Sequence, residues 1–518
     1  MDYDYVIIGA GSAGCVLANR LSEDQGVRVA LLEAGGKDGK MEIRMPAAFA
    51  KLFKTEVDWN FTTAKQPELE NRELYWPRGK VLGGSSSLNA QMWVRGHKAD
   101  YDGWELPGWS YEDVLPYFQR AERRDGSNVG GVYGSDGPLW ISELRSPNPA
   151  TKAFLDACEE VGLTRLDELN EPSNEGFSPT PVTQRRGRRW SAADAYLRPA
   201  VTRSNLTLIS GEIVRKVTIK DGRAVGVEYG DKGQRITARR EVILAAGAIG
   251  SPQLLMLSGV GDPEALRPLG IEPVGDRPEV GRNLQDHLVC GVTVHCPEPV
   301  TLASAESLRN LARYMLFKRG PLTSNVGEAA AFIRSDASQS APDLELIFAP
   351  APYIEHGFVE PPGHGVTLGV VLLQPESRGR LTLASTDAAA APQIDPGYLT
   401  GASDLRRLIA GVRFAERVAA TGALKQYIGA AMDPWPGEVD DEALARFLRE
   451  QTQTVYHPVG TCRMGADEDS VVDPSLKVRG VAGLRVADVS VMPVINRGHT
   501  HAPAIMIGEK AADLIRSE

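Results

Sequence analysis

The sequence is poor in cysteine, and the few cysteines present are scattered. Five occur in 518 residues, none of them forms a C-x-x-C pair, and an odd number cannot all pair with one another. A disulfide framework and a zinc site are therefore not indicated, and no metal is expected. Cys462 has no obvious partner that would activate its thiol, so we interpret it as a packing residue.

Basic residues are also fewer than acidic ones. The chain has 57 Lys and Arg against 67 Asp and Glu, which gives a net charge of -10. This balance disfavours broad attraction to nucleic acid or to an anionic membrane. One basic run, 185–189, is short and precedes the helix-cap pattern at 191–194, so we interpret it as a solvated or rim loop. The expected partner is a small molecule.

Long apolar runs are absent. The most apolar stretch, 242–261, is interrupted by glycines, a proline and a serine, and it is too short a run to cross a bilayer. The N-terminus shows no basic region followed by a cleavable apolar segment, so a cytoplasmic location is expected. An apolar fraction of 42% and 53 glycines are typical of a globular protein of several compact units.

The N-terminal residues carry a complete βαβ pattern. A buried strand at 5–8 enters the turn Gly9-Ala-Gly-Ser-Ala-Gly14, a helix follows at 15–21, and a second strand at 27–32 ends at Glu33. The glycines permit a tight turn and close approach to a pyrophosphate, the helix N-terminus faces the phosphates, and the acid suits a ribose hydroxyl. This pattern predicts dinucleotide binding.

The rest of the chain alternates strand and helix signals without a repeat. Strands are expected at 206–209, 225–229 and 241–245, then at 367–374 and 380–384, with helices at 403–421, 440–451 and 504–516. We expect a discontinuous cofactor domain of residues 1–150, 200–289 and 466–518. A substrate-binding cap of residues 151–199 and 290–465 would cover it.

Four further segments carry a specific resemblance. A second glycine-rich segment, 77–89, contains adjacent Gly83 and Gly84, which a nicotinamide domain alone would leave without a role. With 247–261, 456–465 and 496–508 it resembles the glucose-methanol-choline (GMC) oxidoreductases, in the order found in that family. The sequence looks nearest to choline dehydrogenase-like and aryl-alcohol oxidase-like members.

The resemblance implies a fold and an activity. Members of the family have an α/β fold in which a Rossmann-like FAD domain carries a discontinuous substrate domain on a mixed, mainly antiparallel sheet. Most oxidise an alcohol, here expected to be primary, to a carbonyl compound by hydride transfer to flavin N5. Oxygen or a quinone-like acceptor then reoxidises the flavin. One branch of the family is a lyase that keeps FAD without redox chemistry, and a flavin-containing binding or photoactive protein is a further alternative.

By position, the resemblance also implies which residues hold FAD. The expected cofactor-binding residues are Gly9, Gly11, Ser12, Ala13, Gly14, Glu33, Ala34, Trp59, Arg78, Gly83, Gly84, Ser85, Asn89, Met92, Val94, Val214, Ala246, Gly247, Asp488, Val489, His499 and Thr500. Some relatives attach FAD covalently through a histidine just before the asparagine of the double-glycine segment. That position is Leu88 here, which has no nucleophile, so the FAD is expected to be non-covalent.

Two histidines match the catalytic positions of the family. His457 would accept the hydroxyl proton, because an imidazole can do so near neutral pH, and His499 would hydrogen-bond the substrate oxygen. The role of His501 is left open between catalysis, support and pocket wall. Asp286 and His287 are interpreted as positioning residues. Expected pocket residues are Asn325, Phe348, Tyr456 and His501, with Trp435 as a weaker candidate.

Overall fold

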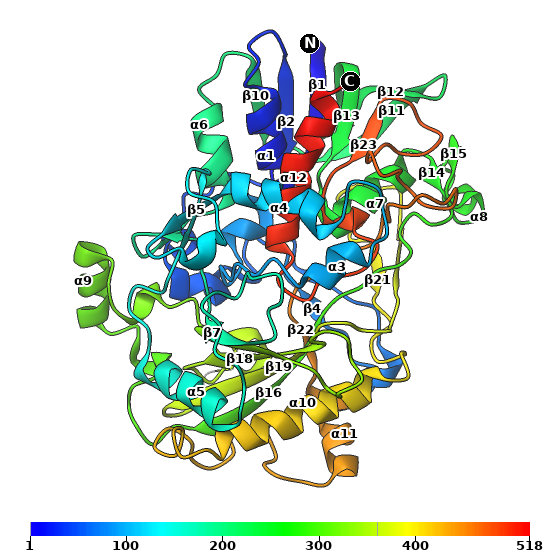
Figure 1. The fold of residues 1–518 in the computed structure, drawn as a ribbon. Helices are drawn as coiled ribbons and strands as arrows, with labels where there is room; N and C mark the ends of the chain where they lie inside the picture. Colours follow the sequence, from blue (N-terminus) through cyan, green and yellow to red (C-terminus); the bar gives the residue numbers. More distant parts are fainter. Residues whose placement is uncertain (1, 360) are drawn as a thin grey trace.

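The computed structural model describes residues 2–359 and 361–518. Two large β-sheets organise this part of the chain, one near each end of the molecule in Figure 1. No helix in it is both long enough and apolar enough to span a lipid bilayer.

The first sheet is built around parallel strands that are buried on both faces. Its parallel part has the order β10 (Leu206–Ser210), β2 (Val29–Glu33), β1 (Asp2–Ile8), β13 (Gln234–Leu244), β23 (Leu484–Val486). Near-continuous apolar sequences such as Val6-Ile-Ile8 suit strands covered by helices on both sides. The expected antiparallel meander is formed by β12 (Arg223–Tyr229) and β11 (Val214–Lys220) beside β13.

Parallel strands bring their carboxyl ends to one edge of this sheet. Gly9 follows β1, Glu33 ends β2, Ala245 follows β13, and Asp488 comes two residues after β23. Segments that are hundreds of residues apart therefore meet at one edge, which is where open α/β sheets bind their ligands.

The second sheet is antiparallel in all its described pairs. Its order is β22 (Gln453–Thr454), β16 (Leu288–His295), β19 (Gly365–Leu372), β18 (Leu344–Ala349), β17 (Ala329–Ile333), β7 (Gly176–Pro179). The outer face is covered by α5 (Pro149–Glu160) and α10 (Asp404–Ala419), and α11 (Asp441–Gln451) packs against α10 (Figure 1). The two sheets confirm the predicted fold class, whereas the exact domain boundaries stay a prediction.

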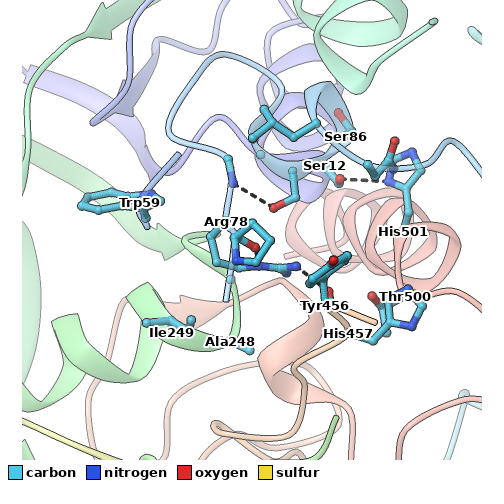
Figure 2. Close-up of a pocket in the computed structure, with 18 of the residues that line it drawn as sticks. Ser12, Trp59, Arg78, Ser86, Ala248, Ile249, Tyr456, His457, Thr500 and His501 are labelled. Atoms are coloured by element: carbon cyan, nitrogen blue, oxygen red, sulfur yellow. Dashed lines mark hydrogen bonds between the residues drawn. The ribbon is translucent and has the colours of Figure 1, made fainter. Parts of the chain in front are cut away.

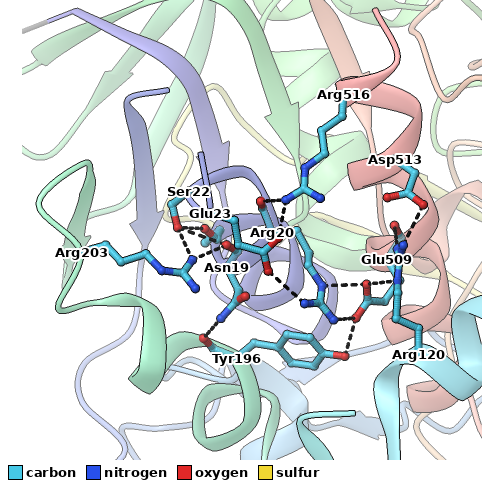
Figure 3. Close-up of polar contacts among 11 residues, drawn as sticks. Asn19, Arg20, Ser22, Glu23, Arg120, Tyr196, Arg203, Glu509, Asp513 and Arg516 are labelled. Carbon is cyan, nitrogen blue, oxygen red and sulfur yellow. Dashed lines mark hydrogen bonds and ion pairs between the residues drawn. The ribbon is translucent and has the colours of Figure 1, made fainter. Parts of the chain in front are cut away.

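Two helices of the first domain are fixed against each other near the ligand edge. A Cβ at Gly508 would lie 3.0 Å from the Ala13 carbonyl oxygen, so α12 (His501–Arg516) crosses α1 (Ser12–Leu21) closely. Beside this crossing, the fully buried Glu509 carboxylate accepts hydrogen bonds from Arg20, Arg120 and the Tyr196 hydroxyl (Figure 3).

This packing places the N-termini of both helices at one cavity. The cluster around Glu509 draws charges from α1, α12 and α4 (Tyr111–Ala121), and three residues donate four hydrogen bonds that compensate the buried carboxylate. The last helix begins at His501, three residues before the predicted start, so Pro503 lies in its first turn.

Candidate active site

A cavity lies between the carboxyl edge of the first sheet and the inner face of the second. Most of the predicted residues line it: Gly9, Gly11, Ser12, Ala13, Glu33, Ala34, Trp59, Arg78, Gly84, Ser85, Asn89, Met92, Val214, Ala246, Gly247, Asn325, Tyr456, His457, Asp488, Val489, His499, Thr500 and His501. Figure 2 shows this wall from Trp59 at one side to His501 at the other.

Three glycines let backbone segments around the cavity approach each other closely, with no side chains between them. A Cβ at Gly9, where φ is +98°, would lie 2.5 Å from the Ala245 carbonyl oxygen. A Cβ at Gly84 would lie 2.7 Å from the Gly11 Cα atom, so the two glycine-rich segments touch backbone to backbone. A ligand placed there meets main-chain N–H groups instead of side chains, which is what a pyrophosphate requires.

Glu33 and several helix termini offer polar groups along this wall. The Glu33 carboxylate accepts the N–H groups of Ala10 (2.8 Å) and Gly35 (2.7 Å), and burial raises the pKa of Glu33 to about 7. Its remaining lone pairs suit a ribose diol. The N-cap residues of α1, α12 and α7 (Gly247–Leu257) make no side-chain cap. The first-turn N–H groups of α1 and the positive end of α12 remain for a ligand, whereas the Gly247 N–H of α7 donates to the Asp488 carboxylate at 2.9 Å.

His501 lies at the end of the cavity that is lined by the glycine-rich turn before α1. Its Nδ1 atom is 3.0 Å from the Ser12 hydroxyl, as Figure 2 shows, and burial lowers the pKa of His501 to about 3. Its Nε2 atom is buried without a hydrogen-bond partner among the described residues. An orphaned polar atom beside the glycine cradle is a site for a ligand atom. Together with the cradle and Glu33, it fits a dinucleotide.

Three predicted cofactor residues do not line the cavity and support it from behind. A Cβ at Gly14 would lie 1.8 Å from the Gly9 carbonyl oxygen, so Gly14 permits the packing of α1 on β1. Gly83, with φ of +90°, turns the chain before Gly84. The Val94 carbonyl accepts the N–H of His499 at 3.0 Å and anchors that residue. Their contribution is to shape, not to direct contact.

The protonation of His457 follows from a chain of buried contacts. His287 Nε2 is 3.0 Å from the Leu373 carbonyl oxygen, which can only accept, so this nitrogen carries a proton. Burial lowers the pKa of His287 to about 3, so its ring is neutral and Nδ1 is an acceptor. His457 Nδ1, 3.0 Å away, must donate. The network thereby assigns the lone pair of His457 to Nε2.

The loop that carries His457 is held from two further sides. The Asp286 carboxylate accepts the His457 backbone N–H at 2.6 Å, and it also accepts the hydroxyls of Tyr398 and Thr454. Arg78 donates to the Tyr456 carbonyl. Tyr456 itself has a φ of +67°, a strained conformation for a bulky residue that such surrounding contacts must stabilise. These contacts agree with the interpretation of Asp286 and His287 as positioning residues.

His499 stands next to His457 with a partner of its own. The two ring centroids are 5.0 Å apart and the rings are perpendicular. His499 Nε2 is 3.0 Å from the carboxylate of Glu345, a buried residue on β18. A carboxylate accepts here, so Nε2 donates and Nδ1 remains for another ligand. Burial lowers the pKa of His457 well below its usual range, and His499, His287 and Arg78 lower it further.

Aromatic residues that sequence reasoning did not select form the outer wall. Phe49, Phe53, Tyr353 and His356 line the cavity with Tyr456, and the Tyr456 hydroxyl is 2.6 Å from His356 Nδ1. His356 and the neighbouring Val326 also have positive φ values, at +62° and +72°. Nothing in the local sequence signals these conformations, which cluster where the backbone turns around the cavity.

Two of the pocket predictions are wrong in position. Phe348 points to the outer face of the second sheet, where its ring stacks on Phe154 at 4.9 Å, because side chains alternate along β18 and Ile347 takes the inner face. Trp435 packs against Phe447 instead of lining the cavity. Asn325 does line it, and its Oδ1 atom is buried without a partner within the described chain.

Comparisons with known proteins identify the family. Models of the GMC oxidoreductase family match residues 3–289 and 375–508. An uncharacterized GMC-type oxidoreductase of Mycobacterium tuberculosis is 53% identical over 99% of both chains. An alcohol dehydrogenase [acceptor] of Pseudomonas putida is 42% identical over 99% of this chain and 95% of its own. A solved structure of Aspergillus oryzae formate oxidase, concerned with FAD modification, has 28% identity and a TM-score of 0.92, covering 100% of this chain and 98% of that one.

The fold and the glycine-lined cavity define a flavin-dependent oxidoreductase. The chain belongs to the GMC oxidoreductase family. The predicted cofactor, FAD, and the predicted class, an FAD-dependent alcohol oxidoreductase, are thereby confirmed at the level of the family. The roles of individual site residues stay predictions.

The side chain at position 88 bears on whether FAD can be attached covalently. Leu88 lines the cavity and packs with Ile43, Leu52 and Val81, and a leucine offers no atom to bond to the flavin. We expect acid precipitation of the purified protein to release all of its yellow cofactor into the supernatant. Absorption spectra of both fractions check this, and flavin that stays with the denatured polypeptide would contradict it.

Proposed function

We propose that this protein oxidises a primary alcohol to the aldehyde with FAD as hydride acceptor and His457 as base. The observation that carries the proposal is the buried relay from the Leu373 carbonyl through His287 to His457. It leaves an unprotonated Nε2 on a neutral imidazole in the cavity. Such an atom can accept a hydroxyl proton at neutral pH.

Removing the hydroxyl proton is the part of the reaction that the protein performs. An alcohol carbon gives up hydride readily only as its oxygen loses the proton. When bound, FAD supplies the electron-pair acceptor, taking the hydride at its N5 atom. His457 takes the proton on Nε2, and the resulting imidazolium keeps its Nδ1–H bond to His287. His287 therefore holds the base in one orientation before and after proton transfer.

His499 is assigned to the substrate oxygen. Glu345 holds Nε2 of its ring and so fixes the ring. Paired with this carboxylate as an imidazolium, His499 would also carry a proton on Nδ1, which it can donate to the oxygen that loses its proton. Arg78 adds a positive charge near His457, and the uncapped N-terminus of α12 adds a partial one. Both favour negative charge that develops in the cavity during the reaction.

The outer wall suggests the kind of alcohol. Phe49, Phe53, Tyr353 and Val326 pack in one cluster with Tyr456, the residue before His457. The acidic residues that line the cavity, Glu33, Glu212 and Asp488, follow strands at the carboxyl edge of the first sheet instead. We infer an aromatic or aliphatic alcohol instead of a sugar or a quaternary-amine alcohol, because the latter need several polar partners or an anionic one.

An anaerobic titration tests the proposed function. Aryl, aliphatic, amino and sugar alcohols are added to the oxygen-free holoenzyme, and the flavin absorbance is followed. We expect bleaching by aryl or aliphatic primary alcohols, with one aldehyde formed per flavin reduced. A flavin that stays oxidised while a cyanohydrin is cleaved would indicate the lyase alternative. No bleaching and no cleavage would favour a binding or photoactive protein.

A further inference from the structure

Helix α9 (Leu308–Phe317) presents apolar side chains to solvent. Leu308 is 85% exposed, Leu316 74%, Phe317 64% and Met315 50%. In Figure 1 this helix projects from the side of the molecule opposite β14 and β15. The inner face of the helix packs against the protein: Tyr314 is buried, and its hydroxyl donates to the Arg44 carbonyl at 3.0 Å. The outer face is therefore an unusual apolar surface.

Cations surround this surface. Arg309, Arg313, Lys318 and Arg319 lie on or just after the helix, and none of the four forms an ion pair with any described residue. The helix contains no acidic residue, and the nearest one before it, Glu306, is paired with Lys51 at 2.5 Å. The chain as a whole has a net charge of -10, so this concentration of positive charge is confined to one part of its surface.

The basic run at 185–189 adds to the same surface. A Cβ at Gly187 would lie 2.5 Å from the Lys318 carbonyl oxygen, so this hairpin abuts the end of α9. Arg186 and Arg188 are exposed there and form no ion pair within the described chain. The run is thus not an isolated solvated loop, since its exposed cations stand beside exposed leucine and phenylalanine.

We propose that the outer face of α9, with Arg186 and Arg188, docks on an anionic lipid bilayer. Apolar side chains enter the headgroup boundary while basic ones contact the headgroups, which is the pattern of a helix lying on a membrane surface. A second copy of this chain is a poorer occupant, because a symmetric contact would bring the same unpaired cations face to face.

Docking there would set the cavity close to the bilayer. The inner face of α9 packs with Met45 and Ala48, and the same segment, Pro46–Leu52, carries Phe49 into the cavity wall. The helix and the cavity thus share one wall. A membrane-borne alcohol or electron acceptor would reach the site over a short path from this face.

Vesicle flotation with the holoenzyme tests the proposal. We expect binding to phosphatidylcholine vesicles that contain about one third phosphatidylglycerol, with release at high salt, and weak binding to phosphatidylcholine alone. No binding of the wild-type protein to the anionic vesicles would overturn the proposal.

Two variants and one control locate the binding surface. The triple variant Leu308→Ser, Leu316→Ser, Phe317→Ser and the variant Arg186→Gln, Arg188→Gln, Arg309→Gln, Arg313→Gln should each weaken anionic-vesicle binding at least about tenfold. All these residues are exposed, so the flavin absorbance and the folding should be kept. The control Val129→Ser, Val201→Ser, Val274→Ser removes three other exposed apolar groups, 41–47% exposed, away from α9 and should bind as the wild type does.

Two outcomes would contradict the assignment of this face. Equal loss of vesicle binding in the control would mean that general surface apolarity is responsible. A wild-type dimer that the serine triple variant converts to a monomer in light scattering, without vesicle binding by either, would show that a second copy covers α9.

Discussion

Replacing His457 by alanine is expected to slow the reduction of the flavin by an alcohol about 10² to 10⁴-fold, the usual contribution of a positioned base. The variant should still bind FAD, because the glycine cradle of Gly9, Gly11 and Gly84 lies at the other end of the cavity. Anaerobic stopped-flow mixing with a saturating alcohol measures this step apart from reoxidation.

His501→Ala is the matched control for this experiment. His501 is a second buried, neutral histidine of the same cavity, but its partner is the Ser12 hydroxyl on the phosphate-binding side. We expect it to weaken FAD binding and to leave the reduction rate of the loaded enzyme nearly unchanged. If His457→Ala were reduced at the wild-type rate while His501→Ala was not, the base would be His501.

The pH dependence of the same step follows from the lowered pKa of His457. Burial and the neighbouring His499 favour the neutral ring, so the base is present at neutral pH and is lost only as the pH falls through its lowered pKa. The rate of flavin reduction should therefore stay constant from about pH 7 upward until other groups titrate, and fall only in acid solution well below pH 6.5. A rate that is still rising steeply at neutral pH would contradict this.

Most of the residues that the sequence assigns to the cofactor line the cavity, for a physical reason. Gly9 and Glu33 belong to one βαβ unit, whose short-range pattern already fixes where they point. The positions of residues 247 and 488 beside them can also be predicted, because the carboxyl ends of parallel strands lie at one edge of the sheet. His457 and His499 come from motifs that resemble those of the family.

The residues on the substrate side of the cavity are brought together by the register of strands that are distant in the sequence. Local sequence patterns do not reveal this register. Phe348 and Ile347 are adjacent in sequence, yet only Ile347 faces the cavity, since each step along a strand reverses the side chain. Glu345 reaches His499 only because β18 occupies its place in the second sheet. His356 lines the cavity in a backbone conformation with positive φ, which the neighbouring sequence does not indicate.

Replacing His287 by leucine is expected to lower the limiting rate of flavin reduction about 10²-fold, although His287 touches neither flavin nor alcohol in the proposed reaction. Leucine cannot accept the Nδ1–H of His457. The His457 proton is then free to move to Nε2, the tautomer that cannot act as base, and the ring loses its fixed orientation. The dissociation constant for the alcohol should change little, because no substrate contact is removed.

His287→Asn separates a role in tautomer selection from a merely structural one. The asparagine Oδ1 atom is as many bonds from the backbone as the histidine Nδ1 atom, so it can accept the same hydrogen bond from His457. We expect it to restore much of the rate, even though asparagine fills the buried space less well than leucine does. If both variants were slowed equally, or if the loss lay in alcohol binding with an unchanged limiting rate, His287 would only fill space. Rescue by the smaller residue would show that the accepted hydrogen bond keeps Nε2 of His457 ready to take the proton.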